Sequence, residues 1–432
     1  MLIVSTTLLL LFIASSLYVG AAIGMLGATL SSLYSPLPLL RGVGELAWGT
    51  SSDFTLVAVP MFILMGELLL RSGLAEKMFD ALDKWVGHIP GGLMHTNIAA
   101  ATLFAATSGS SVATAATVGT VSIPNMHKHG YRQALFLGSI AAGGTLGILI
   151  PPSINMVLYG ALSETSVSDL YLAGFIPGLL MAVLFSVLVF VACLVNRKLA
   201  PRKPRASWGE RFRALWALGP PLYLFILVVG SIYLGWATPT EASALGVVGT
   251  FLYVVSTGQY SWTRLWTALE GTVRTTAMVM LIVISAYFLN FVMSTIGLTD
   301  IAVSAVGSLT WDPIYVMLAI IAVYMLLGCF VETLTLMVAT TPIIVPIVVA
   351  LGYDPVWFGV LFVVLIELAL ITPPIGMNLF VVQSVRTSGA FRDVALGSLP
   401  FAAVMLGVIL LLLAFPEVAT WLPKFYNGLK ST

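Results

Sequence analysis

The stretch ELALITPPIGMNLFVV, Glu367 to Val382, decides the fold because it interrupts a long apolar segment near its middle. It contains the pair Pro373-Pro374, followed by Gly376 and Asn378. A proline pair removes backbone donors and leaves carbonyls of the preceding turn without partners. Inside a bilayer, each unsatisfied polar group costs several kcal/mol. The stretch therefore predicts a discontinuous helix whose ends face protein, water or a bound ion.

The composition around this stretch is that of a membrane protein. Hydrophobic residues make up 59% of the 432-residue chain and charged residues only 9%, whereas a soluble domain carries roughly 25% charged residues. Apolar runs long enough to cross about 30 Å of hydrocarbon recur along the chain. We therefore expect an all-α polytopic membrane protein, with spans near 2–34, 52–71, 131–164, 170–196, 215–236, 240–258, 276–297, 354–387 and 393–416.

The charge distribution predicts the orientation. The linker NRKLAPRKPRASWGERFR, 196–213, holds seven Arg or Lys residues against one Glu, which favours the cytoplasm. Counting crossings from this loop places the N-terminus inside and the C-terminal tail outside. The loops assigned to the outside carry Asp169, Asp300, Asp312 and Asp354, in agreement with the count.

The count of crossings requires that the segments 91–128 and 313–350 each enter the membrane and leave it by the same face. Each is apolar, about two short helices long, and interrupted by small or polar residues. Read as two full crossings, each would need two spans of at least about 17 residues, and the charge pattern does not exclude that alternative. We favour re-entrant hairpins because the tips are too polar for external turns after such short helices.

Helix-breaking residues are duplicated in order along the chain. Pro373-Pro374 follows Pro151-Pro152 by 222 positions (373 − 151), and Gly352 follows Gly130 by the same offset. An offset of 223 relates Asn378 to Asn155. An odd number of crossings separates the copies, so the sequence predicts an inverted repeat. Inverted repeats with broken helices are typical of secondary transporters.

The hairpin tips and helix breaks supply polar groups that could bind ions or a substrate. A half-helix ends in carbonyls that suit a cation, and the next begins with amides that suit an anion. The first tip, 105–120, holds only Ala, Gly, Ser and Thr apart from two valines. Such residues also form ordinary helix-packing faces in membrane bundles, but the nearby break at Pro151-Pro152, with Ser153 and Asn155, favours a ligand site.

The second tip carries a carboxylate, Glu332, and Glu367 lies in the segment before the second break. A carboxylate at membrane depth is costly and indicates a functional site, although Glu332 could instead cap a helix. Glu67 and Glu241 lie nearer span ends and are interpreted as structural. Because no Lys or Arg lies at either tip or break, a bound anion would need co-bound cations, which couples the two binding events.

Several motifs together resemble a known family. They are TSGSSVATAATVG, IPNMHKHGY, GILIPPS, DLYLAGFIPGLLMA, ELALITPPIGMNLFV and LPFAAVMLGVILLLL. They resemble the large membrane (DctM-like, M) subunit of tripartite ATP-independent periplasmic transporters, within the ion-transporter superfamily. The resemblance runs over nearly the whole chain, and the paired PP motifs in context are specific to it.

The resemblance implies an elevator-type transporter with two hairpins and two discontinuous helices. Residues 91–165 and 313–390 would form the transport domain, 1–71 and 166–297 the scaffold, 72–90 and 298–312 the arms, and 391–432 a C-terminal helix and tail. Na⁺ would be the coupling ion. One implied sodium site comprises Ser108, Gly109, Ser110, Pro152, Ser153 and Asn155, and the other comprises Glu332, Thr333, Thr372, Gly376 and Asn378. The implied substrate-binding residues are Ser110, Ser111, Ser153, Asn155, Thr333, Gly376 and Asn378.

The resemblance also implies partners and a location. They are a small four-helix membrane subunit, a periplasmic substrate-binding protein, an organic acid substrate and membrane lipid, with no nucleic acid. The first span begins at Leu2, so we expect the small subunit to be separate. The expected location of the protein is the bacterial inner membrane. A stand-alone anion permease of the same superfamily is the alternative. An enzyme is not expected, because no metal-ligand spacing, nucleophile–base pair or phosphate-binding loop occurs.

Overall fold

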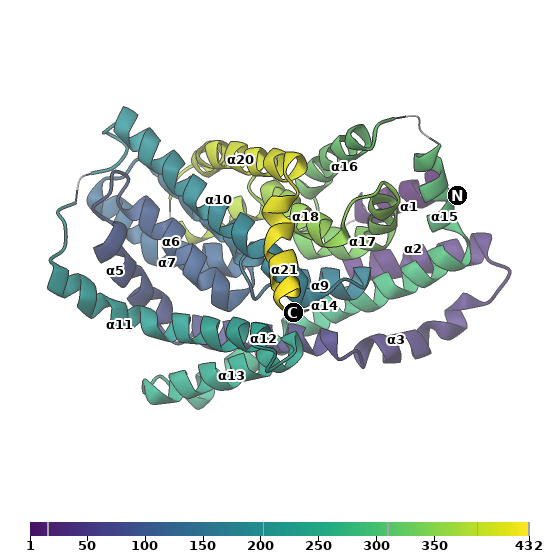
Figure 1. The fold of residues 1–432 in the computed structure, drawn as a ribbon, viewed down its shortest axis with the longest axis horizontal. Coiled ribbons are helices and arrows are strands. Elements are labelled where there is room, and N and C mark those ends of the chain that lie inside the picture. Colours follow the sequence, from purple (N-terminus) through teal and green to yellow (C-terminus); the bar gives the residue numbers. More distant parts are fainter. Residues whose placement is uncertain (15–16, 202, 309–310, 387, 431–432) are drawn as a thin grey trace.

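The computed structural model describes residues 1–14, 17–201, 203–308, 311–386 and 388–430. Some positions in the predicted first span, basic linker, second arm, second broken helix and tail lie outside these residues. The described chain is helical throughout, without a strand. In Figure 1, α11 and α13 run along one long edge, continued by α14 and α3, and the other helices lie above them.

The first part of the chain places a hairpin beside a broken helix. After α4 (Ala58–Leu70) and α5 (Leu74–Val86), the hairpin is α6 (Leu93–Ser108) and α7 (Ser111–His129). The broken helix is α8 (Gln133–Leu149) and α9 (Ile154–Ser163), bent by 44°. The long helix α10 (Val167–Val195) follows. This is the order predicted for 91–165.

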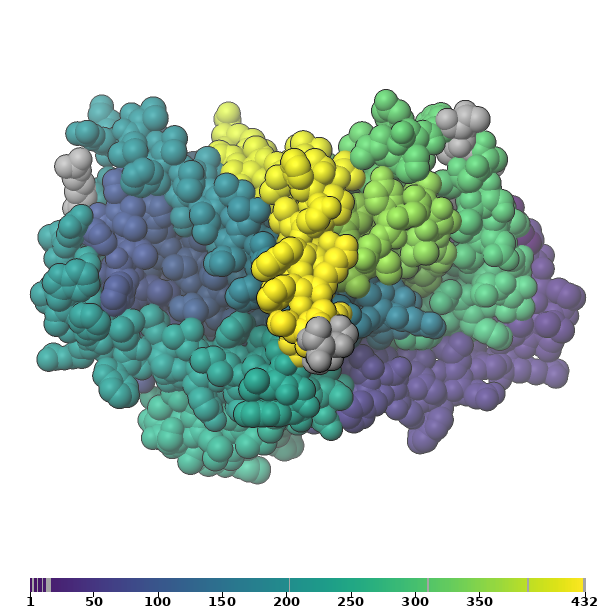
Figure 2. Space-filling model, in the orientation of Figure 1, coloured from purple at the N-terminus to yellow at the C-terminus, as the bar shows by residue number. Residues whose placement is uncertain are grey.

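The second part repeats that order of elements. Helix α14 (Trp262–Thr295) leads to α15 (Leu298–Gly307), and then to the hairpin α16 (Pro313–Gly328) and α17 (Thr333–Ala350). The broken helix is α18 (Pro355–Leu370) and α19 (Met377–Val385), followed by α20 (Phe391–Ala414). In Figure 2, α20 and α21 (Glu417–Lys430) cross the middle of the face between these two parts.

Between the two parts run α11 (Trp208–Phe225), a π-helical turn, α12 (Ser231–Tyr233) and α13 (Pro239–Ser256). Proline occupies positions 220 and 221 of α11, near the π-helical turn, and each proline withholds one backbone donor from the helical ladder. Helices α13 and α14 both pack on α4. Helices α4, α13 and α14 therefore form one packed group, in which α4 contacts α6 of the first hairpin and α14 contacts α17 of the second.

Several predicted boundaries were wrong. The predicted span 2–34 is two helices, α1 (Leu2–Ala14) and α2 (Val19–Tyr34), and the predicted loop 35–50 is largely helical, ending in α3 (Val43–Ser51). Helix α14 begins 14 residues before the predicted 276 (276 − 262), and the predicted tail forms α21. Hydropathy locates apolar cores, but it misses amphipathic helical ends and surface helices.

Five described helices are long and apolar enough to cross a membrane, and two bent pairs raise the number to seven. We predicted nine spans. The two sets differ because several apolar segments are divided into helices of 16 residues or fewer, such as α2 and α18, and because α17, which was predicted as part of a hairpin, is among the five. The chain is nevertheless a multi-pass membrane protein.

Glycines allow the broken helices and their neighbours to touch. A Cβ atom on Gly138 of α8 would lie 1.9 Å from the carbonyl oxygen of Gly397 of α20. Close backbone contact through small residues is the main way in which helices pack inside membranes. Gly138 and Gly397 therefore mark a close contact between α8 and α20.

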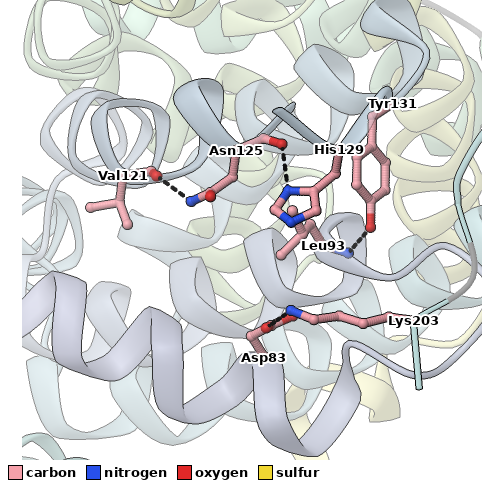
Figure 3. A network of polar contacts seen from close by, with 7 residues as sticks. All are labelled: Asp83, Leu93, Val121, Asn125, His129, Tyr131 and Lys203. Atoms are coloured by element: carbon pink, nitrogen blue, oxygen red, sulfur yellow. Dashed lines mark hydrogen bonds and ion pairs between the residues drawn. The ribbon is translucent and has the colours of Figure 1, made fainter. Parts of the chain in front are cut away.

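The basic linker is attached to α5 and to the turn before α8. Lys203 forms an ion pair with Asp83, and Trp85 Nε1 donates to the carbonyl of Arg211 at 3.1 Å. Figure 3 shows Lys203 reaching Asp83, with Tyr131 nearby accepting from the Leu93 amide. On α5, Leu74, Met78, Phe79 and Leu82 are buried and Trp85 is partly buried.

Candidate functional site

A cavity of about 270 Å³ lies where both hairpin tips meet the first helix break and two helices of the layer beside them. The first tip contributes Ser108 to Ala113, the break contributes Ile154 and Asn155, and the second tip contributes Glu332 to Leu334. The opposite wall is α4 and α14, with Ile63, Gly66, Glu67, Leu70, Thr275 and Val279. The sequence predicted that the tips and the first break meet, but not the wall.

The first tip ends directly against the first break. Gly109 has a φ of +61°, and a Cβ atom there would lie 3.0 Å from the carbonyl oxygen of Pro152. Only glycine adopts this left-handed conformation without cost while leaving room for the carbonyl. The turn between α6 and α7 therefore lies against the turn between α8 and α9.

Two serines begin the helices on either side of this contact. Ser110 Oγ accepts from the amide of Ala113 at 3.4 Å, and Ser153 Oγ accepts from the amide of Met156 at 3.3 Å. Both hydroxyls therefore serve as helix caps. Asn155 is 1% exposed, and its Nδ2 has no hydrogen-bond partner among the described residues. The side-chain amide of Asn155 thus lies at the cavity with a hydrogen-bond donor that no described residue uses.

The small residues of the first tip also pack closely. A Cβ atom on Gly147 of α8 would lie 2.8 Å from the carbonyl oxygen of Ser110, and Ser108 Oγ lies 2.9 Å from Thr114 Oγ1. The packing alternative is therefore correct for part of the tip. The two interpretations are compatible, because Ser108 and Ser110 line the cavity as well.

At the second tip, Glu332 caps α17. Its Oε2 accepts from the amide of Thr335 at 3.1 Å and lies 3.2 Å from Thr335 Oγ1. This is the capping role considered from the sequence. Glu332 and the buried Thr333 also line the cavity. The carboxylate thus combines a helix-capping contact with a position on the cavity wall.

A second carboxylate joins the first hairpin to the second broken helix. Glu367 of α18 is completely buried, and Ser111 Oγ donates to its Oε2 at 2.6 Å. Its Oε1 has no hydrogen-bond partner among the described residues. Ser111 lies at the cavity, so its hydroxyl connects the cavity wall to this carboxylate. The sequence marked both residues but did not predict their contact.

The residues predicted for the second sodium site divide between two places. Thr372 Oγ1 donates to the carbonyl of Leu368 at 2.7 Å, and Gly376 adopts a φ of +57° at the second break. Asn378 is fully buried, and its Nδ2 donates to Ala141 of α8 at 3.4 Å.

Asn378 therefore lies beside the first hairpin. A Cβ atom on Gly144 would lie 3.1 Å both from Asn378 Nδ2 and from the carbonyl oxygen of Ser111. Grouping Asn378 with Glu332 assumed that each break serves its own hairpin. The folded chain instead packs α19 on α7 and α9 on α17.

Glu67 is the residue that the sequence interpretation missed. It lines the cavity from α4 and forms an ion pair with Arg71 at 2.7 Å. Gly271 of α14 makes room, since a Cβ atom there would lie 3.0 Å from the Glu67 carboxyl carbon. The close glycine could not be recognised without the helix pairing. Glu241, by contrast, forms a capping box with Thr238, as its structural interpretation predicted.

The cavity is acidic at its wall. Glu67 and Glu332 are among its lining residues, and no Lys, Arg or His is among those described there. Helix caps and the Ser and Asn side chains supply the other polar groups. An anion entering this cavity would therefore have to bring or meet cations, because two unit charges of like sign repel strongly when water is displaced.

The chain matches known proteins over almost its whole length. The family model for the tripartite ATP-independent periplasmic transporter DctM component matches residues 6–418. The chain is 36% identical over 409 residues to the C4-dicarboxylate TRAP transporter large permease protein DctM of Pseudomonas aeruginosa, covering 94% of both chains. It is 34% identical to the sialic acid large permease protein SiaM of Vibrio cholerae, covering 88% of both.

Solved transporters share the fold at low sequence identity. The YdaH transporter of Alcanivorax borkumensis superimposes with a TM-score of 0.65 at 16% identity, covering 95% of this chain and 98% of that one. MtrF of Neisseria gonorrhoeae gives a TM-score of 0.63 at 14% identity, covering 94% of both chains. These similarities concern the arrangement of helices.

Proposed function

Because the chain belongs to the DctM family of tripartite ATP-independent periplasmic transporters, we propose that it carries an organic acid across the membrane together with Na⁺. The central observation is the cavity of about 270 Å³ between the two tips, the first break and α4–α14. The substrate class follows from relatives named for C4-dicarboxylate and sialic acid.

The acidic wall supports coupling to a cation. An anionic substrate facing Glu67 and Glu332 is repelled unless positive charge enters with it. Bound sodium would make binding of the anion more favourable, and the bound anion would make binding of sodium more favourable by the same free energy. Transport of either ligand alone would then be disfavoured, which is the requirement for symport.

We assign the first sodium to the contact between the first tip and first break, at Ser108, Gly109, Ser110, Pro152, Ser153 and Asn155. The support is the close approach of Gly109 to the Pro152 carbonyl. We assign the second sodium to Glu332, Thr333, Thr372 and Gly376. Asn378 stays in the proposal as a residue shared with the first hairpin, because it lies beside Ser111.

We propose that the two parts are an inverted repeat and that the hairpins move as an elevator against the α4–α14 layer. Corresponding glycines support the repeat: Gly73 and Gly297 precede α5 and α15 with φ of +66° and +71°, and Gly130 and Gly352 follow α7 and α17 with φ of +71° and +89°. The cavity between hairpins and layer supports the sliding contact, since a bound ligand there would touch both.

The proposed partners are a small four-helix membrane subunit and a periplasmic substrate-binding protein. The relative named isethionate TRAP transporter permease protein DctMQ, from Oleidesulfovibrio alaskensis, is longer, and this chain covers 64% of it. We place the complex in the inner membrane with the N-terminus cytoplasmic and the C-terminus periplasmic, because the 196–213 linker is strongly basic.

Uptake into proteoliposomes tests the proposal. The chain is reconstituted with its small subunit, and a C4-dicarboxylate or sialic acid is supplied with the matching binding protein. We expect accumulation driven by an inward sodium gradient and abolished when sodium is equal on both sides. Accumulation that follows a proton gradient and ignores sodium would contradict the coupling ion.

A stand-alone permease is the second candidate. The observation in its favour is that this chain alone builds the cavity wall described here. Omitting the binding protein from the same proteoliposomes separates the two candidates. Undiminished uptake without it would favour the permease, whereas loss of uptake favours the tripartite transporter.

A further inference from the structure

An open apolar groove lies on the outer side of the first part of the molecule. It has a volume of about 590 Å³ and is bounded by α5, α6 and α10. In Figure 2 the teal surface of α10 lies beside the blue surface of the first hairpin region. On α10, Val183 and Val187, which line the groove, are 52% and 49% exposed. The groove is thus an apolar surface that this chain leaves open.

A smaller polar cavity adjoins the groove. It has a volume of about 230 Å³ and is lined by His88, Arg197 and Lys203 together with residues that include Ile89 and Leu194. Ile89 lines both the groove and this cavity. The two spaces are therefore neighbours, one apolar and the other bearing basic side chains.

Basic side chains surround the polar cavity. Arg211 Nη2 lies 3.4 Å from His88 Nδ1. Burial lowers the pKa of His88, and the charges of Arg211 and then Arg205 lower it further. Lys203 is paired with Asp83, whereas Arg197 is exposed. A ligand with a negative group would find Arg197 accessible there.

The spacing along α10 matches one phospholipid. The helix ends at Val195, and the groove residues on it run from Ala182 to Phe190. At about 1.5 Å per residue, Phe190 lies about 8 Å and Ala182 about 20 Å along the axis from the end of the helix at Val195. A lipid with its phosphate at Arg197, just beyond that end, would therefore lay an acyl chain along the groove.

We propose that this groove and the adjoining basic cavity form a binding site for one anionic phospholipid. Its acyl chain would pack between α5, α6 and α10, and its phosphate would face Arg197 and Lys203. Charge complementarity selects an anionic headgroup, since basic pockets at the ends of membrane helices attract such lipids. Because α5 and the 196–213 linker both border the site, the lipid would fasten them to α10.

Native mass spectrometry of the purified full chain tests the site. Palmitoyl-oleoyl phosphatidylglycerol (POPG) and the zwitterionic phosphatidylethanolamine (POPE) with the same chains are titrated separately. We expect one POPG to be retained more tightly than POPE. Arg197→Gln should weaken POPG binding about fivefold, corresponding to about 1 kcal/mol per basic residue. The matched control is Lys198→Gln, an exposed cation in the same linker that does not line the cavity.

The groove is tested by Val187→Trp, which fills it, against Val191→Trp, which lies on α10 outside it. The first should reduce retention of both lipids, and the second should not. Equal retention of POPG and POPE by the wild-type chain would overturn the proposal. So would equal losses from Arg197→Gln and Lys198→Gln, or expulsion of POPG when the small membrane subunit is added.

Discussion

The two helix breaks have the same sequence plan but different surroundings. Residues 150–153 of the first break are buried, whereas Pro374 and Ile375 of the second are exposed. The first break is covered by the tip at Gly109 and by α10, where Tyr171 donates its hydroxyl to the carbonyl of Ser153 at 3.3 Å. The second is covered only in part, with Cys329 of its tip facing the Pro373 carbonyl at 3.7 Å.

The charges differ as well. The first tip carries hydroxyls, and the second carries Glu332, while Glu367 stands where the first part has Thr145. The Ser111–Glu367 hydrogen bond joins the first tip, which carries only uncharged side chains, to a carboxyl group of α18. The comparison teaches that two regions with the same order of helices can carry different chemistry. We expect one break to be occluded and the other accessible in a given transport state.

The largest effect is expected at the exposed break. Replacing Pro373 and Pro374 together by Ala would allow α18 to continue and displace Gly376 and Asn378. A displacement of about 1 Å in a binding geometry can cost about 100-fold in rate, so we expect sodium-driven uptake to be lost. Pro423→Ala in α21 is the control. Wild-type uptake by the double variant would show that the break has no ligand role.

Gly109→Ala tests the buried break. Its Cβ atom would approach Pro152 to 3.0 Å in a left-handed conformation, which costs about 1–2 kcal/mol. We expect about tenfold weaker sodium binding, measured as the sodium concentration for half-maximal uptake. Gly44→Ala, where nothing lies within 4 Å, should leave it unchanged. If Gly109→Ala and Gly44→Ala need the same sodium concentration for half-maximal uptake, a sodium site at this contact is contradicted.

Glu367→Gln tests the connection between the two halves. The change keeps the size of the side chain but replaces one of the two carboxyl oxygens, of which Oε2 accepts from Ser111, by an amide nitrogen. Leaving a buried hydrogen-bonding group without its partner costs about 1–3 kcal/mol, so we expect uptake to fall about tenfold. The conservative Thr145→Ser at the corresponding position should have little effect. If both variants behave as wild type, the charge asymmetry has no functional consequence.

The smallest effects are expected from single ligands at the buried break. Ser110→Ala removes a helix cap worth about 1 kcal/mol, and Asn155→Ala removes the amide at the cavity. Each should weaken sodium-dependent uptake about fivefold while expression stays normal. Ser32→Ala, exposed on α2, is the control. Unchanged sodium dependence in both site variants would remove these residues from the assignment.

Local sequence patterns predicted much of the helix order. Proline pairs, capping serines and glycines act within a few residues, so the hairpins and both breaks were placed within a few positions of α6–α9 and α16–α19. The wall formed by α4 and α14 was not predicted, because Glu67 and Gly271 are distant in sequence and neither carries a local motif. The packing of α9 on α17 and of α19 on α7 likewise could not be read from local motifs, and it places Asn378 beside the first hairpin.

The sequence by itself determined that this chain lies in a membrane, where its helices break, and to which family it belongs. Those properties follow from hydropathy and from the local backbone chemistry of proline and glycine. Only the tertiary structure decided which tip meets which break, that Ser111 donates to Glu367, and that the second break lies partly open. The reason is that apolar helices of similar composition pack almost equally well on many neighbours, and the choice among them depends on shape complementarity over the whole bundle.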